Sequence, residues 1–317
     1  MHHRLASSPE TVHWGWFDAA LPHVLTIESG DLVTIEALSG GPANLPGEGF
    51  HVPPELLDVH AKSQRRVPGH ILTGPVGVRG AQPGDVLEIR ILEVELRQDW
   101  GYTFVRPLAG ALPEDIEAFE QIITRLDRDA KTGTLPWGLK IPLRPFFGVM
   151  GVAPPRTWGA ISSIEPRAHG GNLDNTNLVP GSTLYLPVFN EGAGFSVGDG
   201  HAAQGDGEVC VTAIETALAG TFEIHVRKDL AFDFPAAETA SHLIAMGMDP
   251  DLDTAAKDAL RRMVRRVVEE TGLSRNRAFM LMSLVADVHV TQLVNNHKGA
   301  HVMMPKSALG KVDTRLL

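Results

Sequence analysis

The residues best suited to chemistry gather in two glycine-rich turns. The first turn begins at His169 and reads H-G-G-N-L-D-N-T-N, and the second begins at Gly198 and reads G-D-G-H-A-A-Q-G-D-G-E. An ordinary surface turn needs only one or two glycines, whereas these segments let the backbone fold closely around polar side chains. Histidines and carboxylates presented in this way can bind a metal ion or move a proton.

If the two turns meet in space, their side chains would form one metal site. The candidates are His169, Asp174, Asp199, His201 and Glu208. This mixed set of nitrogen and oxygen ligands suits zinc or another divalent ion with open coordination positions. Such an ion activates a water and polarises a carbonyl, while a carboxylate shuttles the proton. A purely structural reading also stands, because aspartate and asparagine in such turns often bond only to their own backbone.

Three residues outside the turns are further candidates. His13 stands among aromatic residues in T-V-H-W-G-W-F, and His70 precedes an apolar strand in P-G-H-I-L-T-G-P-V. Either histidine could instead be partly buried and bonded to a backbone carbonyl. Glu36 follows V-T-I on a predicted strand, and if it faces an apolar interior its pKa would rise and it would act as a general base.

The two turns meet only if the chain between them returns to the same end of a sheet. S-T-L-Y-L-P-V-F predicts a first strand, and N-E-G-A-G-F-S-V from Asn190 predicts a turn and a second strand. A hairpin of this kind would bring both polar turns together.

The wider pattern divides the chain into four zones that we expect to form one catalytic unit. Residues 1–100 are β-rich with a long loop at 40–67, residues 101–160 are mixed with an acidic helix at 113–123, and residues 161–235 return to strands that include G-E-V-C-V-T-A-I-E-T-A-L. Residues 236–317 are predicted to be helical.

Two helices are predicted in the last zone. Asp253 or Thr254 can cap a helix that runs through Glu270, and Ser274 can cap a second helix to about Val294 with His289 on its apolar stripe. Strands followed by helices predict a mainly β, α+β fold with sandwich or barrel-like sheets and a C-terminal helical pair. The apolar stripes favour a homo-oligomer, a dimer or higher, or packing onto the sheets.

Composition excludes several classes of protein. A formal net charge of −10 without a basic stripe argues against a nucleic-acid partner. The single cysteine, Cys210, excludes an intrachain disulfide and predicts a cytoplasmic protein, and no apolar stretch is long enough to predict a membrane span. The chain also lacks a G-x-S-x-G elbow, a P-loop and a dinucleotide fingerprint.

Several motifs resemble the acetamidase/formamidase family. They are H-G-G-N-L-D at His169, G-S-T-L-Y-L-P-V at Gly181, F-S-V-G-D-G-H-A-A-Q-G-D-G-E-V at Phe195 and V-N-N-H-K-G-A-H-V-M-M-P-K at Val294. The resemblance implies hydrolysis of short aliphatic amides, such as acetamide or formamide, to the acid and ammonia. It also implies a β-rich homo-oligomer with zinc or calcium in or near the site.

The resemblance gives the matched positions, with His13, Glu36 and His70 as looser matches, and we infer the role of each from its side chain. The metal ligands would be His70, His169, Asp174 and His201, the catalytic residues Glu36, Glu208 and Asp199, and the substrate-binding residues His13, Gln204, Asp206 and Gly198. Zinc is the preferred ion and calcium the alternative, while the general base is either Glu208 or Glu36. Backbone N–H groups of the second turn would stabilise the oxyanion. Two alternatives stay open, a cyclic amide or lactam as substrate and a non-catalytic metal-binding or small-ligand-binding β-protein.

Overall fold

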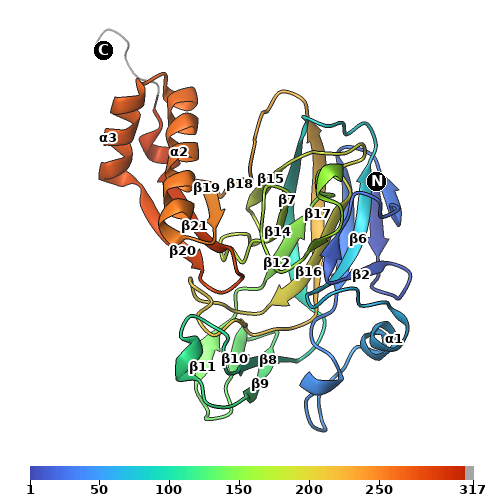
Figure 1. Cartoon of the computed structure of the whole chain (residues 1–317). Coiled ribbons are helices and arrows are strands. Elements are labelled where there is room, and N and C mark those ends of the chain that lie inside the picture. The colour runs from blue at the N-terminus through green and yellow to red at the C-terminus, as the bar shows by residue number, and fades with distance from the viewer. Residues whose placement is uncertain (311–317) are drawn as a thin grey trace.

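Two large β-sheets lie face to face and two helices pack against one end of the larger sheet (Figure 1). The computed structural model describes residues 1–310, so that residues 311–317 of the predicted C-terminal zone lie outside it. The mainly β prediction with C-terminal helices is confirmed, and the sheets form a sandwich. Among the described residues, no helix has the length and apolar character needed to cross a membrane.

The larger sheet has nine strands in the order β1-β5-β17-β7-β15-β18-β19-β21-β20. These strands are β1 (His2–Leu5), β5 (Asp31–Ala37), β7 (Val86–Leu96), β15 (Thr183–Pro187), β17 (Leu218–Arg227), β18 (Ala236–Glu238), β19 (His242–Asp249), β20 (Asp287–Gln292) and β21 (Lys298–Pro305). Strands from three of the four predicted zones therefore share one sheet, and the last zone contributes β18 to β21 as well as helices.

The facing sheet has six strands. Its order is β14-β12-β16-β6-β2, with β4 paired to β6. The strands are β2 (Val12–Trp14), β4 (Leu25–Ile27), β6 (Ile71–Val78), β12 (Phe146–Gly151), β14 (Gly170–Asn172) and β16 (Phe195–His201). Strands β3 (Trp16–Phe17) and β13 (Ile161–Ser162) pair only with each other and form a separate two-stranded sheet.

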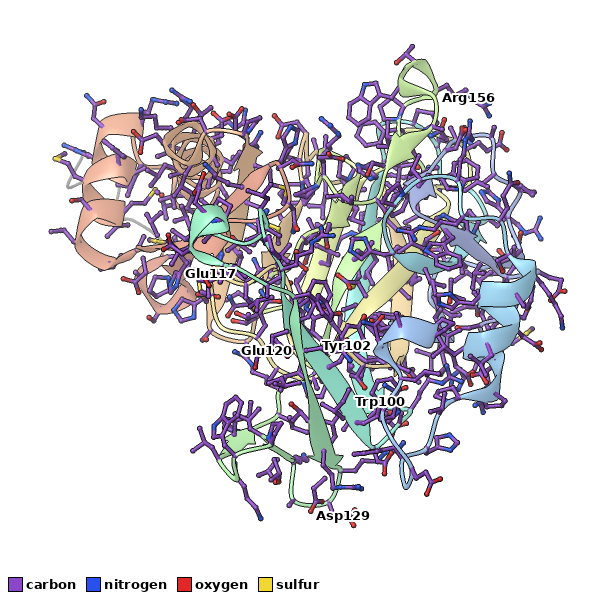
Figure 2. All side chains as sticks on the ribbon, turned by 60° about the horizontal axis from the view of Figure 1, so that its bottom comes forward. Trp100, Tyr102, Glu117, Glu120, Asp129 and Arg156 are labelled. Atoms are coloured by element: carbon purple, nitrogen blue, oxygen red, sulfur yellow. The ribbon has the colours of Figure 1, made fainter. Side chains whose placement is uncertain are left out.

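A four-stranded sheet forms a separate lobe. It consists of β8 (Trp100–Val105), β9 (Glu120–Asp127), β10 (Thr132–Thr134) and β11 (Lys140–Pro142). Figure 2 shows Trp100 and Tyr102 on β8, with Glu120 at the start of β9 and Asp129 at the far tip of the lobe. Tyr102 is buried and pairs through its backbone with Glu215.

The main core fills the space between the two large sheets. Ile89, Phe222 and Ile224 come from the nine-stranded sheet, and Phe147 and Phe195 from the six-stranded sheet, all fully or almost fully buried. Alternate residues of β17 are buried, as expected when one face of a strand covers a core. The hydrophobic effect thus holds the two sheets together and fixes the strands that carry the polar turns.

Three α-helices complete the fold of residues 1–310. They are α1 (Pro54–Lys62), α2 (Leu252–Thr271) and α3 (Arg275–Val285), and short 3₁₀ turns occupy Pro42–Asn44, Pro113–Asp115, Arg156–Trp158 and Lys306–Ala308. Ser274 caps α3 as predicted, whereas Asp251 caps α2 in place of the predicted Asp253 or Thr254, which lie inside the helix. The predicted loop at 40–67 contains α1, whose Leu56 and Val59 are buried.

Two predicted helical segments are strands instead. Only a 3₁₀ turn forms within 113–123, because the residues that follow pair with β8 as strand β9. The last helix ends at Val285 and not near Val294, and β20 follows it with β-branched Val288 and Val290 in alternation. Cross-strand pairing with β21 outweighs the helical spacing there.

The predicted hairpin between the two polar turns is wrong. Strand β15 pairs with β7 and β18 in the nine-stranded sheet, whereas β16 pairs with β12 and β6 in the facing sheet. The chain between them crosses from one layer of the sandwich to the other.

Candidate active site

The two polar turns meet because β14 and β16 flank the same strand. Both strands pair antiparallel with β12, one on each side of it. Asn172 of β14 and Gly198 of β16 are both cross-strand partners of Val149. The two outer strands therefore run in the same direction and end at the same edge of the sheet. Asp174 follows β14, while Asp199 and His201 lie at the end of β16.

His201 is the centre of the resulting cluster. Its Nε2 atom lies 3.3 Å from Asp199 Oδ2 and 3.4 Å from Glu215 Oε2, and its Nδ1 atom lies 4.0 Å from Asp174 Oδ1. Glu208 completes the group, with one oxygen within 4.8 Å of the ligand atoms of Asp174 and His201. All five side chains are buried.

Neighbouring residues orient these side chains. Gln204 Oε1 lies 2.8 Å from His201 Nδ1, and Gln204 Nε2 donates to the backbone oxygen of Asp174 at 3.0 Å. Asn295, from the loop between β20 and β21, donates from Nδ2 to Asp174 Oδ2. Glu215 accepts from the Ala213 backbone N–H at 3.0 Å. Residues far apart in the sequence thus hold one cluster in place.

Gly148 of β12 leaves room for the cluster. A Cβ atom at this position would lie 2.5 Å from Asp174 Oδ1, 2.6 Å from Asp199 Oδ2 and 2.8 Å from His201 Cε1. Side-chain carbons do not approach other atoms this closely, so the carboxylates converge above a strand position that only glycine fits.

The donor atoms fit a divalent metal ion. Asp174 Oδ1, His201 Nε2 and Glu208 Oε2 are buried without a hydrogen-bond partner. Buried polar atoms normally have partners, and four carboxylates around one imidazole carry an excess of negative charge that a cation would balance. Oxygen and nitrogen donors together suit zinc, and the surplus of carboxylates also admits calcium.

The pKa shifts of the clustered side chains agree with this excess of negative charge. Burial raises the pKa of Asp174 to about 7, against the opposing influence of the His201 ring. Burial also raises the pKa of Glu208 and Glu215. Burial alone would lower the pKa of His201, but the carboxylates of Glu215 and Asp199 raise it well above its usual range. Protons therefore take the place of a bound cation when none is present.

A cavity of about 550 Å³ opens onto the cluster. Asp199, Glu208, Glu215 and Asn295 line its polar part, and the other walls include the aromatic side chains of Trp14, Tyr102 and Phe104. A substrate can thus reach the buried carboxylates from outside.

Several of the residues predicted from the sequence come together here. They are Asp174, Asp199, His201, Gln204 and Glu208, with His70 at the edge. His70 Nε2 lies 3.7 Å from Asp199 Oδ2, and His70 lines the cavity. Gly198 lies within β16, where a Cβ atom would be 2.3 Å from the backbone oxygen of Ile71, so this glycine permits close strand pairing.

Other predicted residues lie apart from the cluster. Glu36 forms ion pairs with Arg4 and Arg97, the latter at 3.0 Å, and does not face an apolar site. His13 is bonded to the backbone oxygen of Trp16 and to Ser196 Oγ. His169 is fully buried against Phe17, and Asp206 is partly exposed beside His289.

Two members of the site were missed from the sequence. The sequence pattern predicts a strand from Gly207 that contains Glu215, but residues 202–217 form a loop and strand β17 begins only at Leu218. Cys210 lies in the same loop and not mid-strand. Asn295 belongs to the motif V-N-N-H-K-G-A-H, which was recognised without a role for its asparagine.

Comparison with known proteins assigns the chain to one family. A sequence profile of the Acetamidase/Formamidase family matches residues 1–160 and 156–308. The formamidase of Methylophilus methylotrophus is 31% identical over 209 residues, which cover 50% of this chain and 51% of that protein. The acetamidase of Mycolicibacterium smegmatis is 29% identical over 218 residues, covering 50% and 53%. The chain thus spans about half the length of these relatives.

A solved structure matches over almost the full length of both chains. The crystal structure of an acetamidase from Bacillus halodurans has a TM-score of 0.84 and 32% sequence identity, and the match covers 97% of this chain and 99% of that one. The family profile, the fold and the motifs of the two polar turns agree, and the chain belongs to the Acetamidase/Formamidase family.

Proposed function

We propose that the chain hydrolyses short aliphatic amides, of the formamide or acetamide type, to the carboxylic acid and ammonia. The observation that carries this proposal is the buried cluster of carboxylates around His201 at the base of an open cavity. Membership of the family and the names of its relatives, formamidase and acetamidase, support the same reaction. The sequence-based expectation of an amide hydrolase is retained.

Four of the clustered residues would hold a divalent ion, with zinc preferred and calcium as the alternative. They are Asp174, Asp199, His201 and Glu215, and Glu208 lies beside Asp174 and His201. When bound, such an ion would lower the pKa of a water and polarise the amide carbonyl.

Glu208 is the residue that we assign as proton shuttle. It lines the cavity, its Oε2 atom has no hydrogen-bond partner, and burial raises the pKa of its carboxyl. A carboxylate of raised pKa accepts a proton from the attacking water and returns it to the leaving ammonia. Glu36 was the alternative base, but its ion pairs with Arg4 and Arg97 hold it elsewhere.

Gln204 and Asn295 are positioning residues in this proposal. Gln204 fixes the His201 ring through Nδ1, and Asn295 fixes one oxygen of Asp174. The second oxygen of Asp174 and the Nε2 atom of His201 are thereby left for a ligand. Orientation of ligand side chains by neighbouring hydrogen bonds is a general property of metal sites.

The size of the cavity favours a second candidate substrate class. A volume of about 550 Å³ exceeds what formamide or acetamide needs, and aromatic side chains are among those that line it. Bulkier linear amides or a lactam would fill this space and bury apolar surface against Trp14 and Phe104.

We further propose that the four zones fold as one catalytic unit and that the protein is a cytoplasmic homo-oligomer. The nine-stranded sheet joins strands from β1 to β20, so the zones share one core. The outer face of α3 and β20 exposes Phe279, Met280, Leu284 and Val288, which favours contact with a second copy.

Ammonia release from a panel of amides tests the proposed activity. Formamide, acetamide, a larger linear amide and a lactam are incubated with zinc-replete protein, with chelator-stripped protein, and with stripped protein after zinc is returned. We expect release that falls on stripping and recovers with zinc. Glu208→Gln should lose about 10²-fold or more in rate, while Glu48→Gln, on the exposed surface, keeps it.

Each contrary outcome refutes a definite part of the proposal. Absence of ammonia from every amide with zinc-replete protein would leave a metal-binding protein without amidase activity. Full activity after thorough stripping would refute the role of the metal ion. An unchanged rate in Glu208→Gln would refute the assignment of the proton shuttle.

A further inference from the structure

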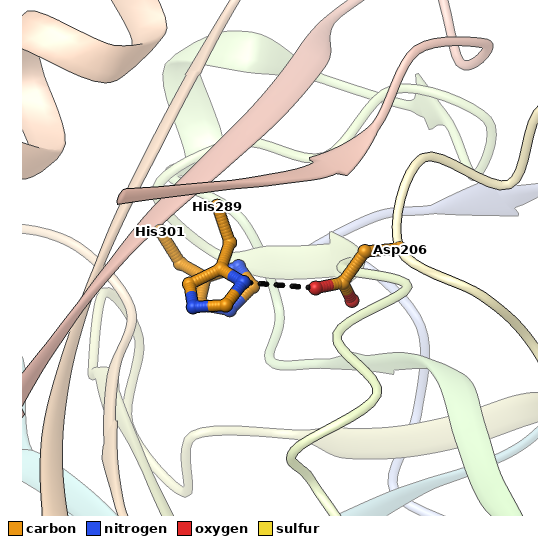
Figure 3. Close-up of side chains that lie close together, drawn as sticks. All are labelled: Asp206, His289 and His301. Atoms are coloured by element: carbon orange, nitrogen blue, oxygen red, sulfur yellow. Dashed lines mark hydrogen bonds and ion pairs between the residues drawn. The ribbon is translucent and has the colours of Figure 1, made fainter. Parts of the chain in front are cut away.

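A second group of ligand-type side chains lies outside the cluster around His201. His289 Nδ1 and Asp206 Oδ2 are 3.1 Å apart, and the rings of His289 and His301 stack with centroids 4.9 Å apart (Figure 3). One ligand atom from each of the three residues lies within 4.8 Å of the others. None of these residues belongs to the group of Asp174, Asp199, His201, Glu208 and Glu215.

Backbone hydrogen bonds fix the three positions relative to one another. His289 on β20 is the direct cross-strand partner of His301 on β21. The loop that carries Asp206 docks on the other side of β20, because Gly207 donates to the oxygen of Thr291 and accepts from the N–H of Leu293, both at 3.0 Å. The group is therefore assembled by the fold and not by the chance approach of exposed side chains.

His301 is held as a neutral ligand. It is fully buried, its Nε2 atom accepts from Asn177 Nδ2 at 3.2 Å, and its Nδ1 atom accordingly donates to Thr291 Oγ1 at 2.7 Å. Burial lowers the pKa of His301 to about 4, so the ring carries no charge near neutral pH. A buried imidazole whose second nitrogen bonds to a fixed oxygen is the usual arrangement of a metal-binding histidine.

The other two side chains can reach a common ligand by rotation. Asp206 and His289 each expose 36% of their side chains, whereas His301 is fully buried. Turning the two exposed side chains breaks the contacts of Asp206 with His289 and Thr176 Oγ1 and the stacking of His289 on His301. A ligand at His301 Nε2 would also replace its hydrogen bond from Asn177. Two imidazoles and a carboxylate, open to solvent, form a three-ligand set with a position left for water.

We propose that Asp206, His289 and His301 form a second divalent-metal site, of zinc type, separate from the candidate active site. Two nitrogen donors favour a transition metal over calcium or magnesium. The bound ion would fasten residues 202–208, which carry Gln204 and Glu208, to the edge strand β20. It would thus stabilise the loop on which the candidate active site depends. The inference uses residues that play no part in the proposed hydrolysis.

Metal stoichiometry of the whole chain tests this proposal without reference to activity. Chelator-stripped protein is titrated with zinc against a competing indicator, and bound zinc is counted by mass spectrometry after gel filtration. His289→Gln and Asp206→Asn should each bind about one equivalent less than the wild type, because a two-ligand remnant binds zinc weakly. His51→Gln removes an exposed histidine elsewhere and should bind as the wild type does.

A second titration separates the two sites. Glu215→Gln weakens the cluster around His201, and zinc bound by this variant should still raise its Tm. Adding His289→Gln should abolish that rise in Tm. The proposal is overturned if His289→Gln binds as many equivalents as the wild type with equal affinity. It is also overturned if zinc raises the Tm of the double variant as much as that of Glu215→Gln.

Discussion

Gly148 is the single residue on which the shape of the candidate site most depends. Asp174, Asp199 and His201 occupy the space that a side chain at this position would take. The residue is a backbone position in β12 with no charge and no hydrogen-bonding side chain, yet it decides whether the donor atoms can converge.

Gly148→Ala should therefore abolish zinc binding at the cluster and reduce ammonia release by about tenfold or more, since the added methyl pushes the carboxylates apart. Zinc stoichiometry and rate are measured on folded protein, verified by circular dichroism. Gly47→Ala is the matched control, because an added methyl there meets nothing within 4 Å. Normal zinc binding by Gly148→Ala would contradict the geometry of the site.

The buried ring of His13 leads to a prediction about how the stability of the protein depends on pH. Burial lowers its pKa from 6.5 to about 4, so the folded chain keeps the ring neutral while the unfolded chain protonates it below pH 6.5. The unfolded state then binds more protons, and stability that is present above pH 6.5 is lost as the pH falls towards 4. The full effect is on the order of 3 kcal/mol.

His13→Gln should flatten this loss of stability, as measured by urea unfolding at several pH values from 7 to 4. The free energy of unfolding of His51→Gln, with an exposed ring, should keep the wild-type dependence. An unchanged slope in His13→Gln would show that His13 is not the buried neutral histidine described here.

At the scale of elements, the helical pair depends on how α2 covers the nine-stranded sheet. Met263 of α2 is fully buried among Leu243 and Val302 of the strands beneath and Met282 of α3. Met263→Ala should lower the free energy of unfolding by about 2–5 kcal/mol, because it leaves a cavity. Met280→Ala on the exposed side of α3 should change it by less than about 0.5 kcal/mol. Equal costs in urea unfolding would refute this packing.

The sequence predicted elements well where local pattern and tertiary contacts agree. The strand at Val86–Leu96 and the helix ending before Gly272 are confirmed. The pattern predicted less well where pairing with a distant strand decides the structure. Residues 287–292 have both helical and strand spacing, and only the neighbouring β21 selects a strand.

The same limit applies to the candidate site. The meeting of the two polar turns was predicted, since glycine and acidic residues are visible in a sequence, and Asp174 and His201 do converge. The predicted hairpin was wrong, because the turns are brought together by β12, which pairs with both β14 and β16. Glu215 carries no local signal, and the motif that contains Asn295 gives this residue no role. Only the folded chain reveals that they face Asp199 and Asp174.

At the scale of the whole molecule, the exposed apolar face of α3 and β20 leads to a prediction about assembly. Leu284 and Val288 expose 80% and 51% of their surface. If this face joins two copies, Leu284→Glu combined with Val288→Glu should shift the protein to the monomer mass in size-exclusion chromatography with light scattering. Leu112→Glu, which alters an exposed leucine in the connection between β8 and β9, should leave the assembly intact. A wild-type protein that is monomeric at high concentration would contradict this interface.

The central claim is that the fold gathers five buried side chains into one divalent-metal site. An anomalous difference map at the zinc edge, from crystals of zinc-replete protein, tests it most directly. We expect a peak next to His201 and the carboxylates of Asp174, Asp199 and Glu215, with Glu208 beside it. A map without a peak at that position, from protein that releases ammonia from acetamide, would contradict it.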